Sequence, residues 1–179
     1  MQEPGILDTE AEFTRGPIGE KLYELTRIFA LIGGLGFIAL VVMSLISIVG
    51  RKLVSIPVPG DIEVMQMGTA VASAAMLAYC EMERHHLRVD FFTASVSPKT
   101  REILDAFSHL LLAVVAVLVA WRTAVSAVSI KEAGETSMIL AWPVWMVVAA
   151  IVPSFVLLAV AGLYNAITHW QLAAAGDSA

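Results

Sequence analysis

The chain has 179 residues, of which 58% are hydrophobic and 15% are charged, and its mean hydropathy is +0.79. Soluble domains carry about 25% charged residues, and here no charge lies between Arg27 and Arg51 or between Glu63 and Glu81, which excludes a water-soluble enzyme domain and predicts an integral membrane protein. The net charge of −5 offers no basic surface for nucleic acid, and the single cysteine, Cys80, excludes a disulfide within the chain and a cysteine-based metal cluster.

The first apolar run is expected to remain in the protein as a transmembrane helix. Ile28–Gly50 is 23 uncharged residues, about 34 Å of helix, which is enough to cross a hydrocarbon core of about 30 Å. The segment before it carries more acidic than basic side chains, unlike the basic start of a cleaved signal peptide. We expect a flexible arm at 1–16 and a helix from Pro17 to about Gly50, whose first turns form an amphipathic lead-in.

Proline and glycine residues separate three further helices. Ser97 and Pro98 together form a helix-start signal, Gly134 ends the segment that follows, and Pro153 is expected to kink the last helix. The expected helices lie at about 61–81, 98–130 and 143–168. The predicted fold is therefore an all-α membrane domain of four transmembrane helices over residues 17–170, followed by a tail at 171–179. Periodicity does not decide the conformation of the connector at 84–97.

Both termini are expected in the cytoplasm. Four spans place the termini and the connector between the second and third helices on one side. That side holds seven Lys and Arg residues, and the opposite side holds four. The positive-inside rule assigns the richer side to the cytoplasm.

Charged residues are expected only at the ends of the spans. Glu63, Arg122 and Glu135 are assigned to the edge opposite the termini, where they would set the depth of the spans or contact a partner. A chain that moved ions by itself would be expected to carry a charge in mid-membrane, or paired broken helices in two inverted repeats. Neither is predicted, and a free-standing channel is also disfavoured because no helix carries a polar stripe.

Two histidines raise an alternative function. His109 and His169 are expected at similar depth near the cytoplasmic face, as the two axial ligands of haem b would be. The chain would then be a membrane-anchor subunit of a respiratory enzyme, and its visible spectrum would show a Soret band. The other interpretation is that these are polar histidines at an interface. No phosphate-binding loop, nucleophile motif or metal-ligand spacing occurs in the sequence.

Small residues predict faces for helix packing. Gly68, Ala72 and Ala75 share one face of the second helix, and Gly33 and Gly36 lie on one side of the first. Small residues let helix backbones approach closely in a membrane, where lipid supplies no hydrophobic drive. We expect these five residues to contact another helix, either of this chain or of a partner.

Two segments resemble a known family. The runs PVPGDIEVMQMGTAVASAAMLAYCEMERHHLRVDFF (57–92) and GETSMILAWPVW (134–145) are similar to the small membrane subunit (DctQ-type) of tripartite ATP-independent periplasmic (TRAP) transporters. In that family a glutamate starts the second helix and a His-hydrophobe-x-Val-Asp element follows the helix, matched here by Glu63, His86 and Asp90. A Glu-Thr pair also precedes a Pro-x-Trp, matched by Glu135 and by Pro143–Trp145. One departure is the doubled His85-His86.

The resemblance implies a function in transport. Such a subunit assembles with a large multi-helix permease, which carries the substrate and sodium sites, and a periplasmic binding protein delivers the substrate, commonly an organic acid. The small subunit would act as a scaffold in the cytoplasmic membrane of a bacterium or archaeon, with no catalytic residue, cofactor or metal. The residues then expected at the membrane interface or against a partner are Glu63, His86, Asp90, Arg122 and Glu135.

Overall fold

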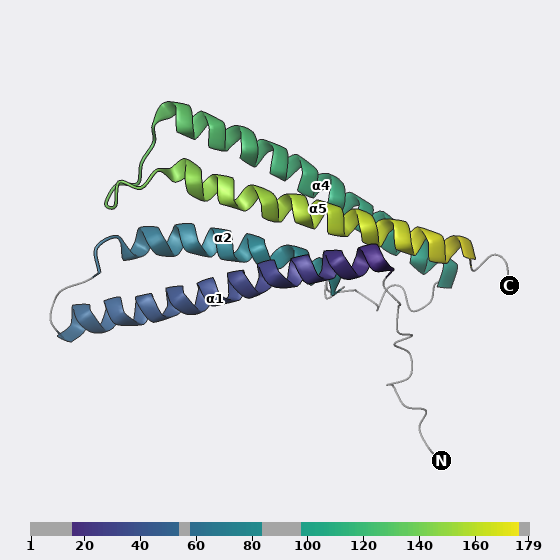
Figure 1. Cartoon of the computed structure of the whole chain (residues 1–179), viewed down its shortest axis with the longest axis horizontal. Helices are drawn as coiled ribbons and strands as arrows, with labels where there is room; N and C mark the ends of the chain where they lie inside the picture. The colour runs from purple at the N-terminus through teal and green to yellow at the C-terminus, as the bar shows by residue number, and fades with distance from the viewer. Residues whose placement is uncertain (1–15, 54–57, 84–97, 176–179) are drawn as a thin grey trace, which may run out of the picture.

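The computed structural model describes residues 16–53, 58–83 and 98–175 (Figure 1). These residues form the helices α1 (Pro17–Leu53), α2 (Asp61–Met82), α4 (Pro98–Ala133) and α5 (Val144–Ala175). The one strand-like feature among them is an isolated bridge between Thr136 and Pro143, in the loop that joins α4 to α5. The connector at 84–97 and both terminal segments lie outside the described residues.

Local signals in the sequence set the helix ends. Gly60 adopts φ +74° directly before α2, and Gly134 adopts φ +66° directly after α4, a conformation that favours glycine. At the end of α4, the Gly134 amide donates to the Lys131 carbonyl and the Glu135 amide donates to the Ile130 carbonyl. This is the pair of hydrogen bonds of a Schellman cap, which explains why the helix ends there.

Three helices run past the ends expected from sequence. α1 ends at Leu53, α4 at Ala133 and α5 at Ala175. The amphipathic lead-in is continuous with α1, and Gly19 within it lies so close to Tyr164 of α5 that a Cβ there would overlap the tyrosine hydroxyl. Pro153 lies inside α5, which continues through it as one helix, and the kink expected there stays a prediction.

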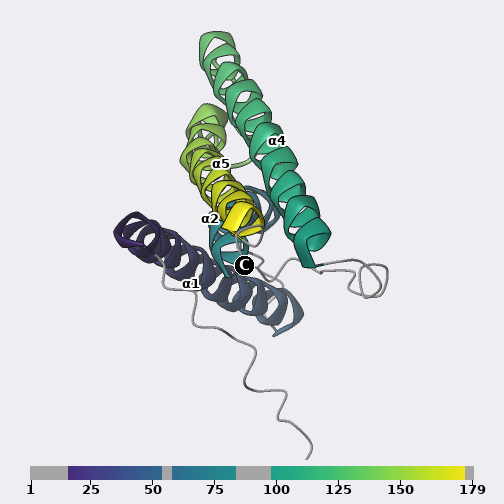
Figure 2. The same cartoon turned by 90° about the vertical axis from the view of Figure 1, so that its right-hand side faces the viewer.

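The helices stand in a row and do not form a closed bundle. α1 packs on α2, α2 packs on α5, and α5 packs on α4, so the order in space is α1, α2, α5, α4. The row converges at the end where α1 and α4 begin and α2 and α5 end, and it spreads at the opposite end (Figures 1 and 2). α2 is therefore an inner helix, with neighbours on two sides.

The core of the row is made largely of alanine, while large apolar side chains cover its outside. Ala78 and Ala161 are fully buried, and most other buried apolar residues of the described part are also alanines. Ile32, Leu35 and Leu118, in contrast, are each more than 60% exposed. This is the reverse of a soluble protein, and it fits helices whose outer faces meet lipid or another apolar protein surface.

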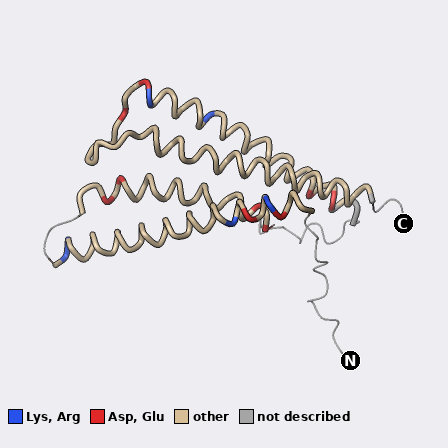
Figure 3. The backbone as a smooth tube through the Cα atoms, viewed as in Figure 1, with Lys and Arg blue, Asp and Glu red and all other residues tan. Residues whose placement is uncertain are grey.

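Three of the described helices are long and apolar enough to cross a membrane, and α2 falls short by composition. The candidates are Pro17–Leu53, Glu102–Ala133 and Val144–Ala174. α2 holds Asp61, Glu63 and Glu81 and is rich in alanine, which lowers its hydropathy. The structure thus supports an all-helical membrane protein with three such spans. The expected topology also needs α2 as a fourth span, which this finding does not include. Most charged residues of the described part lie near the two ends of the row, with one basic position part-way along α4 (Figure 3).

Candidate functional site

Three helices meet in a group of hydrogen-bonded polar side chains at the convergent end of the row. This group, here called the histidine cluster, consists of Glu81 from α2, Glu102 and His109 from α4, and Asn165 and His169 from α5. The Glu81 side chain is completely buried, and His169 is 2% exposed. A buried carboxylate is costly unless neighbours satisfy it, so its contacts define the packing here.

The Glu81 carboxylate holds partners from two other helices. Its Oε1 lies 2.5 Å from Nδ1 of His109, and the Asn165 amide donates to the same oxygen at 3.2 Å and to the Glu81 carbonyl at 2.9 Å. Charge-assisted hydrogen bonds of this kind are about twice as strong as neutral ones. One residue of α2, Glu81, therefore contacts both α4, through His109, and α5, through Asn165.

A second carboxylate–imidazole pair extends the cluster toward the surface. Nδ1 of His169 lies 2.6 Å from Oε2 of Glu102, whose side chain is 33% exposed. The His169 ring stacks on the His109 ring, with 5.2 Å between centroids and 12° between planes. The two pairs thus form one continuous contact from a buried carboxylate to a carboxylate near solvent, with both imidazoles in the middle.

At the opposite end of the row, Glu63 holds the loop between α4 and α5. Its two carboxylate oxygens accept the backbone amides of Ile139 and Leu140, at 2.8 and 3.1 Å. Leu140 also packs against Gly60, where a Cβ would come within 2.6 Å of its side chain. The loop contains Ala141 at φ +53°, a strained conformation for an L residue, which these contacts help to hold.

Asp61 ties the start of α2 to α1. Its carboxylate accepts a hydrogen bond from the Ser47 hydroxyl at 2.5 Å and pairs with Arg51 at 3.1 Å. Ser47 is almost completely buried, while the Arg51 side chain is 58% exposed. Tyr23 of α1 and Tyr79 of α2 are in contact near the other end of the two helices. The α1–α2 pair therefore has a polar contact near each of its ends.

The structure brings the five predicted packing residues together at the contact of α1 with α2. A Cβ at Gly33 would lie 2.7 Å from the Ala72 carbonyl oxygen and 3.2 Å from the Ala75 Cβ, and one at Gly68 would meet Leu40. Gly36, Ala72 and Ala75 line the same small-residue groove, which has a volume of about 580 Å³. These residues were expected to contact a helix of this chain or of a partner. The structure shows their contacts within this chain, between α1 and α2.

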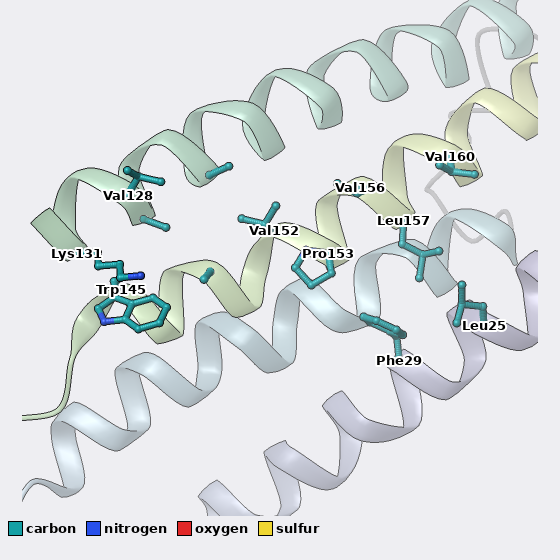
Figure 4. Close-up of a pocket in the computed structure, with 13 residues that line it drawn as sticks. Leu25, Phe29, Val128, Lys131, Trp145, Val152, Pro153, Val156, Leu157 and Val160 are labelled. Atoms are coloured by element: carbon teal, nitrogen blue, oxygen red, sulfur yellow. The ribbon is translucent and has the colours of Figure 1, made fainter.

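A larger apolar groove extends from Lys131 and Trp145, at the spread end, to Leu25 and Val160. Residues of α1, α4 and α5 line about 750 Å³, among them Phe29, Val152 and Leu157 (Figure 4). The groove has a polar atom near one end, because Lys131 Nζ lies 4.8 Å from the centroid of the Trp145 ring. Such a cation–π contact, beside a tryptophan, is typical of the headgroup level of a membrane.

The other predicted site residues are scattered. Arg122 is exposed on α4, and Glu135 is exposed in the loop after α4. His86 and Asp90 lie outside the described residues. Among the residues that the structure describes, no group of three or more His, Cys, Asp or Glu side chains could hold a metal ion.

A comparison with protein-family models decides what kind of protein this is. The model for the DctQ component of the tripartite ATP-independent periplasmic transporters matches residues 21–172. The chain belongs to the DctQ family. Curated proteins and solved structures give no significant match. DctQ proteins are components of transporters and not enzymes, so the histidine cluster of this DctQ chain is not a catalytic site.

The geometry of the histidine cluster does not suit the haem alternative. Two axial histidines must point ring nitrogens at one iron that lies between them. In this DctQ chain the His109 and His169 rings instead stack, with 5.2 Å between their centroids and 12° between their planes, so ring faces and not ring nitrogens meet between them. The two histidines lie side by side, and each contacts a carboxylate of another helix.

Sequence analysis missed Glu81, Glu102 and Asn165 as members of the cluster. Glu81 was assigned to the end of the second helix as an interfacial charge. One signal was present: Glu81 follows Ala74 and Ala78 at helical spacing on one face, and all three are buried. No pattern in the sequence pointed to Asn165, because its partners lie on another helix.

Proposed function

We propose that this chain is the small permease subunit of a sodium-coupled TRAP transporter for organic acids, and that it acts as a scaffold for the large transport subunit in the cytoplasmic membrane. The family supplies the partners of the proposal, namely a large permease and a periplasmic binding protein. The scaffold role is carried by one observation. Near the ends of the row, the buried polar side chains described above form hydrogen bonds to side chains or backbone atoms of a neighbouring helix. Between the two ends, the buried residues are mostly alanines.

In the proposed topology, all four helices cross the membrane and both termini are cytoplasmic. α2 has 22 residues, about 33 Å of helix, which is long enough to span. A helix that is shielded by α1 and α5 needs less hydropathy than one surrounded by lipid, because its small residues face protein. The seven-to-four excess of Lys and Arg supports the orientation.

Purification with the natural partners tests the assignment. A tagged chain, expressed in its own host and extracted in mild detergent, is expected to retain a large multi-helix permease. The complex, reconstituted with its binding protein, is expected to take up an organic acid only when sodium is present outside. Retention of a respiratory flavoprotein, or no permease at all, would contradict the assignment.

Transport by a variant complex tests the scaffold role. Glu63→Ala removes the clamp on the α4–α5 loop, so we expect a lower maximal rate or a less stable complex. The ranking of two competing substrates and the Hill slope for sodium are expected to stay unchanged, because those quantities belong to the transport site. A change in either would show that this chain contributes to that site.

A further inference from the structure

The larger apolar groove is closed at its inner end by α1. The groove follows α5 over residues 145–160, which is about 22 Å of helix. At the inner end Leu25 and Phe29 of α1 lie beside α5 (Figure 4). Beyond that end the two helices are in direct contact, because a Cβ at Gly19 would overlap the Tyr164 hydroxyl. The groove is therefore a long apolar slot with one closed end.

A single cation stands at the other end of the groove. Lys131 is the one ionisable residue among the described residues that line it, and the remaining lining residues are apolar. The Lys131 ammonium lies over the Trp145 ring and forms no ion pair within the described part of the chain. An ammonium group has three hydrogens to donate. A mostly apolar cavity with one well-placed polar group is the usual composition of a site for a small amphipathic ligand.

The size of the groove favours one hydrocarbon chain over a helix of another protein. A helix with its side chains is about 10 Å across, so about 22 Å of helix occupies about 1,700 Å³. The groove holds about 750 Å³, and α1 stands across its inner end. An acyl chain that crosses one leaflet is about 15 Å long, which is half of a hydrocarbon core of about 30 Å, so it fits within the groove lengthwise.

Charge complementarity indicates what the ligand carries at its polar end. A chain that lies along α5 places its polar end beside Lys131, where an anionic group can accept hydrogen bonds from the ammonium. The phosphate of a phospholipid is such a group, and lysines between membrane helices bind anionic headgroups. The neighbouring Trp145 ring is of the kind that lies at headgroup level.

We infer that the groove lined by α1, α4 and α5 binds one anionic phospholipid, with an acyl chain along α5 and its phosphate on Lys131. The inference goes beyond the proposed function, because it assigns a ligand to this chain itself and needs only a protein that lies in a membrane. A lipid in this groove contacts both α1 and α4, which are the two ends of the row. It would therefore add contacts that the chain alone does not supply.

Native mass spectrometry of the purified subunit with added phosphatidylglycerol tests the headgroup contact. Lys131→Gln is expected to weaken binding of one lipid about fivefold, which is the effect of one lysine beside an anionic headgroup. Lys131→Arg keeps the cation and is expected to restore binding. Lys52→Gln, the control, removes an exposed ammonium from the end of α1 and should leave binding unchanged. Equal binding by Lys131→Gln and the natural sequence, or tighter binding of a free fatty acid, would overturn the inference.

Two neighbouring alanines of α5 test the path of the acyl chain. Ala149 lines the groove, whereas Ala150 is exposed and lies outside it. Ala149→Trp fills the groove and is expected to abolish binding of the lipid in the same measurement. Ala150→Trp adds the same bulk outside and should leave binding unchanged. Equal binding by the two variants would show that the lipid lies elsewhere.

Photo-cross-linking in cells gives a result even if Lys131→Gln and Ala149→Trp fail to accumulate. A photo-reactive amino acid replaces Val152, in the middle of the groove, while Lys131 stays intact (Figure 4). The whole transporter is expressed, and the membranes are irradiated. The expected product is the subunit joined to a phospholipid. A cross-link to the permease or to another protein chain would overturn the inference. Sodium-coupled uptake plays no part in these readouts, so its failure would count against the proposed function alone.

Discussion

At the scale of single residues, the histidine cluster replaces hydrophobic packing with charge-assisted hydrogen bonds. Glu81 is completely buried, and its stability in that position depends on His109 and Asn165 from two other helices. Removing one partner of a buried charged pair is more costly than replacing both partners, because the remaining group keeps its desolvation penalty. The cluster is therefore expected to behave as a unit under mutation.

His109→Ala is expected to lower the free energy of unfolding by about 1–3 kcal/mol, because Glu81 loses its closest partner. The measurement is thermal unfolding of the purified subunit in detergent. Ser108→Ala is the control, since the exposed Ser108 hydroxyl bonds only to the Leu104 carbonyl of its own helix. In the Glu81→Gln background, His109→Ala should cost less than in the natural sequence, and equal costs would argue against coupling.

At the scale of elements, α1 and α2 pack closely because glycines at their contact leave no side chain between the two backbones. Gly33 approaches the backbone of α2, and backbone atoms cannot move aside as a flexible side chain can. Gly34, the next residue, has no neighbour within 4 Å of a Cβ position. Two adjacent glycines in the same helix thus occupy opposite situations.

Gly33→Ala is expected to destabilise the subunit by about 1–3 kcal/mol through overpacking against Ala72. Gly34→Ala is expected to be neutral or to stabilise by up to about 1 kcal/mol, since alanine is the better helix former. The same detergent unfolding assay compares the two variants. Equal effects would mean that α1 and α2 are not in contact at this position.

The loop between α4 and α5 depends on an acidic residue that lies 76 positions earlier in the chain. Glu63→Ala removes the acceptor of the Ile139 and Leu140 amides, so both are expected to exchange hydrogen with solvent faster. Hydrogen-exchange mass spectrometry of the loop peptide measures this directly. Glu132→Ala removes an exposed carboxylate near the same loop and should leave the exchange rates unchanged.

At the scale of the whole molecule, four helices in an open row leave two long outer faces and a spread end uncovered by any other described residue of the chain. The convergent end contains the histidine cluster, and the groove lined by Phe29, Val152 and Leu157 runs along α1, α4 and α5 (Figure 4). Many of the row's large apolar side chains are exposed, and its buried apolar residues are mostly alanines. The row is therefore suited to work as part of a larger membrane complex, with lipid covering what partners leave open.

Cysteine labelling tests the orientation of the molecule. In a Cys80→Ser background, Thr136→Cys places a thiol at the spread end and Gln171→Cys places one at the convergent end, both at exposed positions. With cytoplasmic termini, an impermeant reagent is expected to label Thr136→Cys in intact cells and Gln171→Cys only after the membrane is opened. The opposite pattern would invert the proposed topology.

Local signals in the sequence are enough to predict the helical membrane character and several helix ends of this protein. Clustered charges, long apolar runs and the positions of Pro17 and Gly134 are local signals, because a helix forms and ends through bonds between near neighbours. The family resemblance rested on motifs that are also local. For the same reason, the small residues at Gly33 and Gly68 could be recognised as packing positions without their partner being known.

Only the tertiary structure decided which helices meet and which charges are satisfied. The row order α1, α2, α5, α4 pairs Glu81 with His109 and Asn165, and Glu63 with a loop 76 residues away. It also leaves Arg122 exposed on an outer face of α4. The physical reason is that burial and pairing of a charge depend on neighbours from other helices, and the spacing of residues within one helix carries no information about them.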